Sequence, residues 1–155
     1  MVKKETVSII HQPPRILLGM KKIRFGRGKY NGFGGGIENG ENPDESAIRE
    51  TREETGIVII NPIKMGEILF QFPTKEPDHF VYFFRAERFI GIPRETNEMR
   101  PEWFNVTQIP YDKMWSDDIY WLPLLLEGKF FSGYFQFDKN HGIAEYELNE
   151  LDRLD

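Results

Sequence analysis

Cysteine is absent from the 155 residues of this sequence. Disulfide bonds, thiol nucleophiles and cysteine-ligated metal sites are therefore excluded. The sequence also lacks a secretory signal pattern and a run of about 18 apolar residues, the length that a transmembrane helix needs. We therefore expect a soluble, intracellular protein without a membrane partner that acts in the cytoplasm, with an organelle pool left open.

Positively charged residues are fewer than negatively charged residues. The chain has 20 Lys and Arg residues against 25 Asp and Glu, a formal net charge of −5, and no basic tail. Because basic surfaces supply most of the affinity for DNA and RNA, we expect no polymeric nucleic acid as a partner. An acidic protein that handles an anionic substrate needs cations at its site. The three histidines have no ligand spacing between them, so we assign them no role.

The composition supports a full hydrophobic core. Hydrophobic residues make up 39% of the chain and aromatic residues 14%, and this length is that of an ordinary domain. We therefore expect one domain spanning residues 1–155 and a monomeric protein. Aromatic side chains also stack on nucleobases, so their abundance is compatible with a nucleotide ligand.

Apolar and β-branched runs bounded by proline, glycine or polar residues predict strands. The expected strands are residues 6–11, 15–20, 58–61, 63–72, 80–89, 102–105, 130–137 and 144–148. We expect loops at 21–31 and 90–100 and a frayed tail at 149–155. An apolar helical stretch covers 115–127, where Pro123 forces a kink or a helix start. Together with a more polar helix, this order predicts an α/β (α+β) fold, a mixed β-sheet with helices on its faces.

The more polar helix is predicted over residues 43–55. Asn42 is a good N-cap, Pro43 suits the first helical position, and Glu45 has the spacing of a capping box. Gly56 fits the position that follows the last turn. Both ends of this helix are therefore marked in the sequence.

Three carboxylates share one stripe of this helix. At about 100° per residue, Glu50, Glu53 and Glu54 lie within about 100° of each other. Arg49 can offset part of their repulsion by pairing with Glu53 or Glu45. The ordinary interpretation of such a charge run is a solvated helix face.

A glycine-rich loop before the helix favours a different interpretation. Its glycines, which permit close backbone approach, are Gly32, Gly34, Gly35, Gly36 and Gly40. Loop oxygens and the three carboxylates form the hard ligand set that Mg²⁺ prefers, with Mn²⁺ as a substitute, and substrate phosphates complete the shell. The segment therefore predicts a magnesium site for diphosphate chemistry, although its spacing alone leaves the solvated face open.

The segment from Gly35 to Ile57 resembles the Nudix box, G-x5-E-x7-R-E-U-x-E-E-x-G-U, in which U is a bulky aliphatic residue. The fixed positions are held by Gly35, Glu41, Arg49, Glu50, Glu53, Glu54, Gly56 and Ile57. Thr51 is the exception, because an aliphatic residue is usual there. Thr51 lies on the core face, where it costs packing or adds a hydroxyl hydrogen bond along the helix.

The resemblance extends from about residue 6 to residue 137. The segments that carry it are LLGMKK (17–22), NGFGG (31–35), NEMRPEWF (97–104), MWSDDIYW (114–121) and PLLL (123–126). They are similar to the MutT-like branch of the Nudix family that hydrolyses oxidised purine nucleoside triphosphates. Gly36 stands where these enzymes usually have lysine, so a cation near the phosphates is lost.

The resemblance implies a Nudix αβα sandwich in a single domain, with the box at 35–57. It also implies Mg²⁺-dependent hydrolysis of nucleotides such as 8-oxo-dGTP and 2-hydroxy-dATP to the monophosphate and diphosphate. Such an enzyme sanitises the nucleotide pool and thereby prevents mutation. A small nucleoside triphosphate is the partner that this activity requires.

The resemblance also assigns site residues. The metal ligands are Glu50, Glu53, Glu54, Glu98 and the carbonyl of Gly34. The catalytic set is Glu53, Glu54, Glu98 and Arg49, with Glu54 orienting or deprotonating the attacking water and Glu98 in support. The substrate contacts are Thr6, Lys21, Phe25, Asn31, Phe33, Gly35, Phe70, Trp115, Asp117 and Asp118.

Asp117 and Asp118 have a second interpretation as the acidic first turn of a helix that follows Ser116. In a base pocket the two acids would raise each other's pKa, so that one stays protonated. One carboxyl then donates and the other accepts, which allows oxidised guanine and oxidised adenine nucleotides alike. The rivals are a Nudix hydrolase of dGTP, a dinucleoside polyphosphate or ADP-ribose, and a non-catalytic nucleotide-binding Nudix domain.

Overall fold

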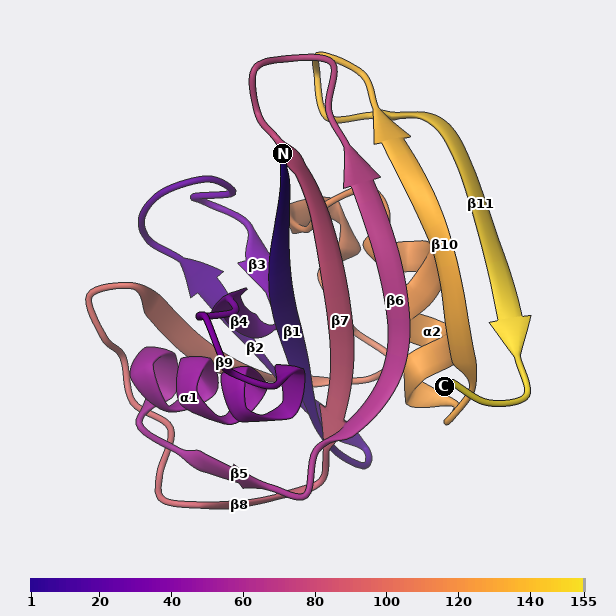
Figure 1. Cartoon of the computed structure of the whole chain (residues 1–155). Coiled ribbons are helices and arrows are strands. Elements are labelled where there is room, and N and C mark those ends of the chain that lie inside the picture. Colours follow the sequence, from indigo (N-terminus) through magenta and orange to yellow (C-terminus); the bar gives the residue numbers. More distant parts are fainter. Residues whose placement is uncertain (155) are drawn as a thin grey trace.

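The computed structural model describes residues 1–154, in which a mixed β-sheet carries one α-helix on each face (Figure 1). The strands are β1 (Val2–Gln12), β2 (Arg15–Lys21), β3 (Tyr30–Asn31), β4 (Phe33–Gly36), β5 (Val58–Ile60), β6 (Ile63–Gln71), β7 (Asp78–Ala86), β8 (Arg88–Ile90), β9 (Met99–Asn105), β10 (Phe130–Phe137) and β11 (Ile143–Leu151). The helices are α1 (Pro43–Thr55), α2 (Asp118–Leu126) and the 3-10 turn η1 (Tyr111–Lys113).

The main sheet follows the order β11-β10-β6-β7-β1-β2-β3, with β4 pairing with β1 and β9 with β2. The β1–β7 and β6–β10 pairs are parallel, whereas β6 and β7, β10 and β11, and β1 and β2 pair antiparallel. β5 and β8 form a separate two-stranded ribbon. This mixture confirms the predicted fold class.

The pleat of the strands divides the core between the two helices. Ile9 faces the α2 side, where it joins a cluster with Trp121 and Leu122. The next residue, Ile10, faces the α1 side, where it clusters with Ala47. One hydrophobic cluster therefore lies between the sheet and α2, and the other between the sheet and α1. This is the expected αβα sandwich.

Helix α1 has the predicted ends. The N–H of Asn42 donates to Glu45 Oε1 at 2.9 Å, as the capping-box spacing predicts. Gly56 adopts φ +82°, and its N–H donates to the carbonyl of Arg52 at 2.8 Å. This glycine ends the helix in a left-handed conformation and turns the chain toward β5.

Several predicted boundaries are wrong because tertiary pairing extends or moves the elements. β9 begins at Met99 and not at 102, and β3 lies inside the predicted loop 21–31. α2 begins at Asp118 and runs through Pro123, so the alternative of a helix start at the proline is excluded.

Other differences lie at the two ends of the chain. β1 begins at Val2, because its polar first residues pair with β7. β11 pairs with β10 as far as Leu151, so the predicted fraying is wrong for 149–151; position 155 of that tail lies outside the described residues. Within residues 1–154, none of the helices has the length and apolar character required to cross a membrane.

Candidate active site

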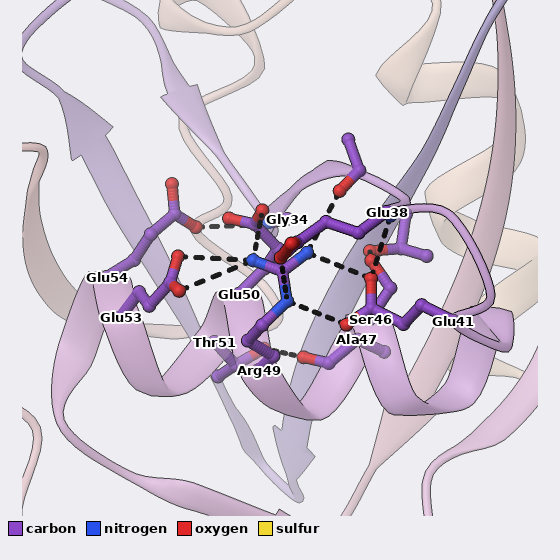
Figure 2. Close-up of polar contacts among 12 residues, drawn as sticks. Gly34, Glu38, Glu41, Ser46, Ala47, Arg49, Glu50, Thr51, Glu53 and Glu54 are labelled. Atoms are coloured by element: carbon purple, nitrogen blue, oxygen red, sulfur yellow. Dashed lines mark hydrogen bonds and ion pairs between the residues drawn. The ribbon is translucent and has the colours of Figure 1, made fainter.

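Arg49 is the centre of the carboxylate cluster on α1 (Figure 2). Its Nε and Nη2 donate to the two oxygens of Glu41 at 2.7 and 3.0 Å, and Nη2 also donates to the carbonyl of Gly36 at 3.0 Å. Its Nη1 donates to Glu50 at 3.0 Å and to Glu53 at 3.3 Å. The predicted Arg49–Glu53 pairing is therefore confirmed. The shortest hydrogen bond of Arg49, however, is to Glu41 in the loop that precedes the helix.

This fork of hydrogen bonds fixes the loop against the helix. The Arg49 guanidinium, opposed by partial burial, holds the pKa of Glu41 down at about 2. Glu38 adds another carboxylate, 3.1 Å from Arg49 Nε. Glu45, the other predicted partner of Arg49, instead accepts a hydrogen bond from the N–H of Asn42 at the helix N-terminus.

Glu54 lies beneath this cluster and is only 4% exposed. Its Oε1 accepts a hydrogen bond from the N–H of Gly34 at 2.8 Å. Burial raises the pKa of Glu54 to about 8, with the charges of Glu50 and Glu98 adding to the rise. Burial also raises the pKa of Glu50, although Arg49 opposes this. Carboxylates from the helix and from a distant loop thus influence one another.

Glu98 reaches the cluster from the loop before β9. The hydroxyl of Thr96 donates to the carbonyl of Glu54 at 2.9 Å, which attaches this loop to the end of α1. Arg24 Nη1 lies 3.8 Å from Glu98 Oε1. The structure therefore brings Glu98 near Glu50 and Glu54, although 44 residues separate it from Glu54 in sequence.

The donor types at this site fit Mg²⁺. They are carboxylate and carbonyl oxygens, which hard divalent cations prefer. The predicted glycine-rich loop is partly strand, since Gly34, Gly35 and Gly36 belong to β4. This strand lies directly against the acids, because a Cβ on Gly35 would be 2.6 Å from Cδ of Glu50. Their raised pKa values show that negative charge is costly here, and a cation would relieve this cost.

The side chains of the predicted metal ligands do not converge on one point where a metal ion could bind. Among residues 1–154, no group of three or more His, Asp or Glu side chains lies at metal-binding spacing. The physical reason is Arg49, which takes the place of a cation for Glu50 and Glu53, while Glu54 turns to the N–H of Gly34. The metal-ligand assignment therefore stays a prediction.

A pocket of about 260 Å³ adjoins Glu54 on the α2 side of the sheet. It is lined by most of the predicted substrate residues: Thr6, Lys21, Phe25, Asn31, Gly35, Phe70, Trp115, Asp117 and Asp118. Gly34 and Glu54 line it as well. Its volume is just below the usual range for drug-sized ligands, which suits a nucleobase better than a whole nucleotide.

Asp117 and Asp118 are buried at this pocket, 3% and 6% exposed. Trp121 Nε1 donates to Asp117 Oδ2 at 2.7 Å and to Asp118 Oδ1 at 3.2 Å. Burial raises the pKa of both acids, and the charge of Asp117 raises the pKa of Asp118 further. Asp118 therefore keeps its proton more readily and donates to Asp117.

The structure does not bring every predicted residue to the pocket. Phe33 is fully buried in the cluster on the α1 side, so its assignment as a substrate contact is corrected to a core role. Arg49, Glu50, Glu53 and Glu98 lie outside the pocket lining, which the acidic cluster reaches through Glu54.

Other pocket residues have no role in the sequence prediction. Trp121 is one of them, and its indole N–H binds both aspartates. Its position four residues after Asp117 was a usable signal, because such residues share a helix face. Glu5 and His79 also line the pocket. They come from parallel neighbouring strands far apart in sequence, so no local spacing reveals them.

The two departures from the Nudix pattern have local explanations. Thr51 is fully buried, and its hydroxyl donates to the carbonyl of Ala47 at 2.7 Å, which confirms the expected hydrogen bond along the helix. Gly36 is exposed with open space around its Cα, so the fold does not require glycine there.

Comparison with known proteins agrees with this geometry. The NUDIX domain model matches residues 2–125. The chain is 45% identical to the oxidized purine nucleoside triphosphate hydrolase of Danio rerio over 149 residues, 96% of each chain. It is 44% identical to the Mus musculus protein of that name, covering 95% of this chain and 94% of that protein. The MutT protein of Bacillus halodurans aligns with a TM-score of 0.84 at 25% identity, covering 95% of this chain and 97% of that one. The chain belongs to the Nudix family.

Proposed function

We propose that this protein is a Mg²⁺-dependent diphosphatase of oxidised purine nucleoside triphosphates such as 8-oxo-dGTP and 2-hydroxy-dATP. It converts them to the monophosphate and diphosphate and so removes mutagenic precursors from the nucleotide pool. The observation that supports this most directly is that Glu54 and the Asp117–Asp118 pair line one pocket. The names of the fish and mouse relatives point to the same substrates.

In this proposal the acidic cluster holds the cation. Glu50, Glu53, Glu54, Glu98 and the Gly34 carbonyl would be its ligands, with Mn²⁺ as a substitute. When bound, Mg²⁺ neutralises phosphate oxygens and lowers the pKa of a coordinated water. Arg49 holds the side chains of Glu41, Glu50 and Glu53 in place by hydrogen bonds.

Glu54 is the proposed general base. Burial raises the pKa of Glu54 to about 8 without a metal, which makes its carboxylate a stronger base than usual, and a cation bound beside it would keep it ionised and able to accept a proton from water. Glu98 supports it, because its charge contributes to this rise. Lys21 lines the same pocket and offers a cation to the phosphates.

The buried aspartates select the base in this mechanism. A bound purine would replace the hydrogen bond between the two acids, with Asp118 donating its proton to the base and Asp117 accepting from it, so the pair can read a Watson–Crick edge in more than one pattern. Asn31 adds an amide at the pocket, with its Nδ2 donating to the carbonyl of Lys29 at 3.1 Å. Trp115 and Phe25 supply aromatic walls.

The test is diphosphate release from a panel of nucleotides with Mg²⁺. We expect kcat/KM for 8-oxo-dGTP and 2-hydroxy-dATP to exceed that for dGTP, a dinucleoside polyphosphate and ADP-ribose. A preference for one of the last three would replace the proposed substrate class. Absence of turnover with every nucleotide, despite tight binding of 8-oxo-dGMP, would indicate a nucleotide-binding domain instead.

The same proposal describes a monomer in the cytoplasm that acts on a small nucleotide, built as a single Nudix domain over residues 1–155. Sedimentation and cell fractionation test the first two statements. Folding of the whole chain as one cooperative unit in calorimetry tests the third.

A further inference from the structure

A buried histidine between two carboxylates forms one wall of the pocket. His79 Nδ1 is hydrogen-bonded to Glu5 Oε1, and His79 Nε2 is bonded to Glu76 Oε2. Lys3 lies 3.9 Å from the same Glu76 oxygen. This charged group has no part in the proposed hydrolysis, yet His79, Glu5 and Lys3 all line the pocket.

Strand register places this group at the opposite end of the pocket from the aspartates. β1 and β7 are parallel, and the register pairs that matter are Lys3 with His79, Glu5 with Val81, and Val7 with Phe83. Phe83 packs on Trp121, with ring centroids 4.2 Å apart, and Trp121 binds Asp117. His79 lies four residues before Phe83, about 13 Å along the strand. Apolar Val7 and Val81 line the space between the two polar ends.

The mouth of the pocket is at the histidine end. Phe25 is 37% exposed and contacts His79, with ring centroids 5.6 Å apart. The Glu5 side chain keeps 25% of its surface exposed, whereas the His79 side chain keeps 10%. The bond to His79 uses Glu5 Oε1 and leaves Oε2 for a ligand.

A purine read at its Watson–Crick edge turns its N7–C8 edge the other way. If Asp117 and Asp118 bind the Watson–Crick edge, as the proposed function states, the N7–C8 edge points toward Glu5. The 8-oxopurines carry a proton on N7, whereas N7 of an unmodified purine is an acceptor. A carboxylate attracts the first and repels the second.

We propose that Glu5, fixed by His79, is a specificity-determining residue that accepts a hydrogen bond from N7–H of an 8-oxopurine. The inference rests on the proposed function for the orientation of the base. Glu5 thereby discriminates 8-oxoguanine from guanine at the pocket mouth, while the aspartates read the Watson–Crick edge. 2-Hydroxyadenine has no proton on N7, so it gains no hydrogen bond from Glu5 and is selected by the aspartates alone.

The histidine holds this acceptor in its charged form. Burial lowers the pKa of His79, but its hydrogen bonds and charge interactions with Glu5 and Glu76 outweigh this and raise the pKa overall. An imidazolium donates from both nitrogens, so each carboxylate is an acceptor. Glu5 therefore cannot turn into a donor that would suit an unmodified purine.

The test is calorimetric binding of the monophosphates 8-oxo-dGMP and dGMP to the wild-type chain and to Glu5→Gln. With its amide oxygen bonded to His79, the glutamine turns an NH₂ donor toward the base. We expect 8-oxo-dGMP to bind at least about tenfold more weakly, about 1.4 kcal/mol, while dGMP binds equally or more tightly.

Glu76→Gln is the matched control, because it alters the other carboxylate on His79 but does not line the pocket. It should change the 8-oxo-dGMP to dGMP ratio less than about threefold, well below the loss of a charged hydrogen bond. An unchanged ratio in Glu5→Gln, equal weakening of both ligands, or an equal shift in Glu76→Gln would overturn the inference. Failure of hydrolysis with an intact binding ratio would contradict only the proposed function.

Discussion

The proposed active site contains two groups of acids, and their surroundings shift the pKa values of the two groups in different ways. The glutamates of α1 surround Arg49, which holds the pKa of Glu41 at about 2 and moderates that of Glu50. Asp117 and Asp118 are almost completely buried and accept hydrogen bonds from the indole N–H of Trp121. The charge of Lys29 lowers the pKa of Asp118 less than burial and Asp117 raise it. One group is therefore stabilised by a cation and the other by a shared proton.

This contrast shows how residues of one type acquire different chemistry. Where a cation can approach, neighbouring carboxylates stay ionised and can hold a metal. Where burial outweighs the nearest cation, desolvation favours the neutral acid, which becomes a hydrogen-bond donor. Glu54 lies between these two cases, because it is buried like the aspartates but adjoins the acidic cluster.

The largest expected effect comes from neutralising the glutamate group. Glu53→Gln or Glu54→Gln should lower kcat on the order of 1000-fold, because metal binding and base catalysis contribute several kcal/mol. Initial rates of diphosphate release measure this loss. Circular dichroism should show an unchanged fold, and retention of activity by both variants would remove the distinction between the two groups.

The aspartate group should respond to substitution through substrate choice. We expect Asp117→Asn to lower kcat/KM for 8-oxo-dGTP about 10- to 100-fold, because the charged acceptor is lost. Asp118→Asn should have a smaller effect, because an amide replaces the donor of a protonated acid. Parallel assays with 2-hydroxy-dATP compare the two hydrogen-bonding patterns. If both variants leave kcat/KM unchanged for both nucleotides, the aspartates do not read the base.

The role of Glu54 can be tested by measuring protein stability at different pH values with and without Mg²⁺. Its pKa is about 8 in the folded state against an ordinary 4.5, so between these pH values the folded protein holds a proton that the unfolded chain releases. This group therefore lowers stability as pH rises through that range when chelator is present.

Mg²⁺ should raise the melting temperature more at pH 8 than at pH 5, because protons compete with it. At a hundredfold excess over Kd the gain is about 2.7 kcal/mol, on the order of 5–10 °C. Thermal scans with Mg²⁺ or chelator measure the difference. Glu54→Gln should reduce its pH dependence, and an equal Mg²⁺ effect at both pH values would contradict the assignment.

The smallest expected effect is at Thr51, where a substitution tests the buried face of α1 separately from its charged face. Thr51→Val removes the hydroxyl bond to Ala47 and keeps the volume, so stability should change by no more than about 1 kcal/mol. Activity should stay within about twofold, because Thr51 lies on the buried face away from Arg49. Urea denaturation and kcat/KM measure the two, and a large loss of activity would show that the core face positions the acids.

Local features of the fold were predictable because their causes are local. The ends of α1 follow from Asn42, Glu45 and Gly56, whose hydrogen bonds and φ angles involve neighbouring residues. The boundaries of β1, β9 and β11 were not predictable, because partner strands supply their hydrogen bonds. Phe33 was placed wrongly for the same reason, since burial against α1 is a tertiary property.

The sequence by itself determined helix α1 and its stripe of carboxylates. The spacing of Glu50, Glu53 and Glu54 follows from helix geometry, and the similarity to the Nudix box identified the family. Only the tertiary structure decided how each acid holds its charge. Arg49 reaches back to Glu41, Trp121 binds both aspartates, and parallel strands bring His79 beside Glu5. The physical reason is that a carboxyl's charge depends on burial and on its spatial neighbours, and chain folding supplies both.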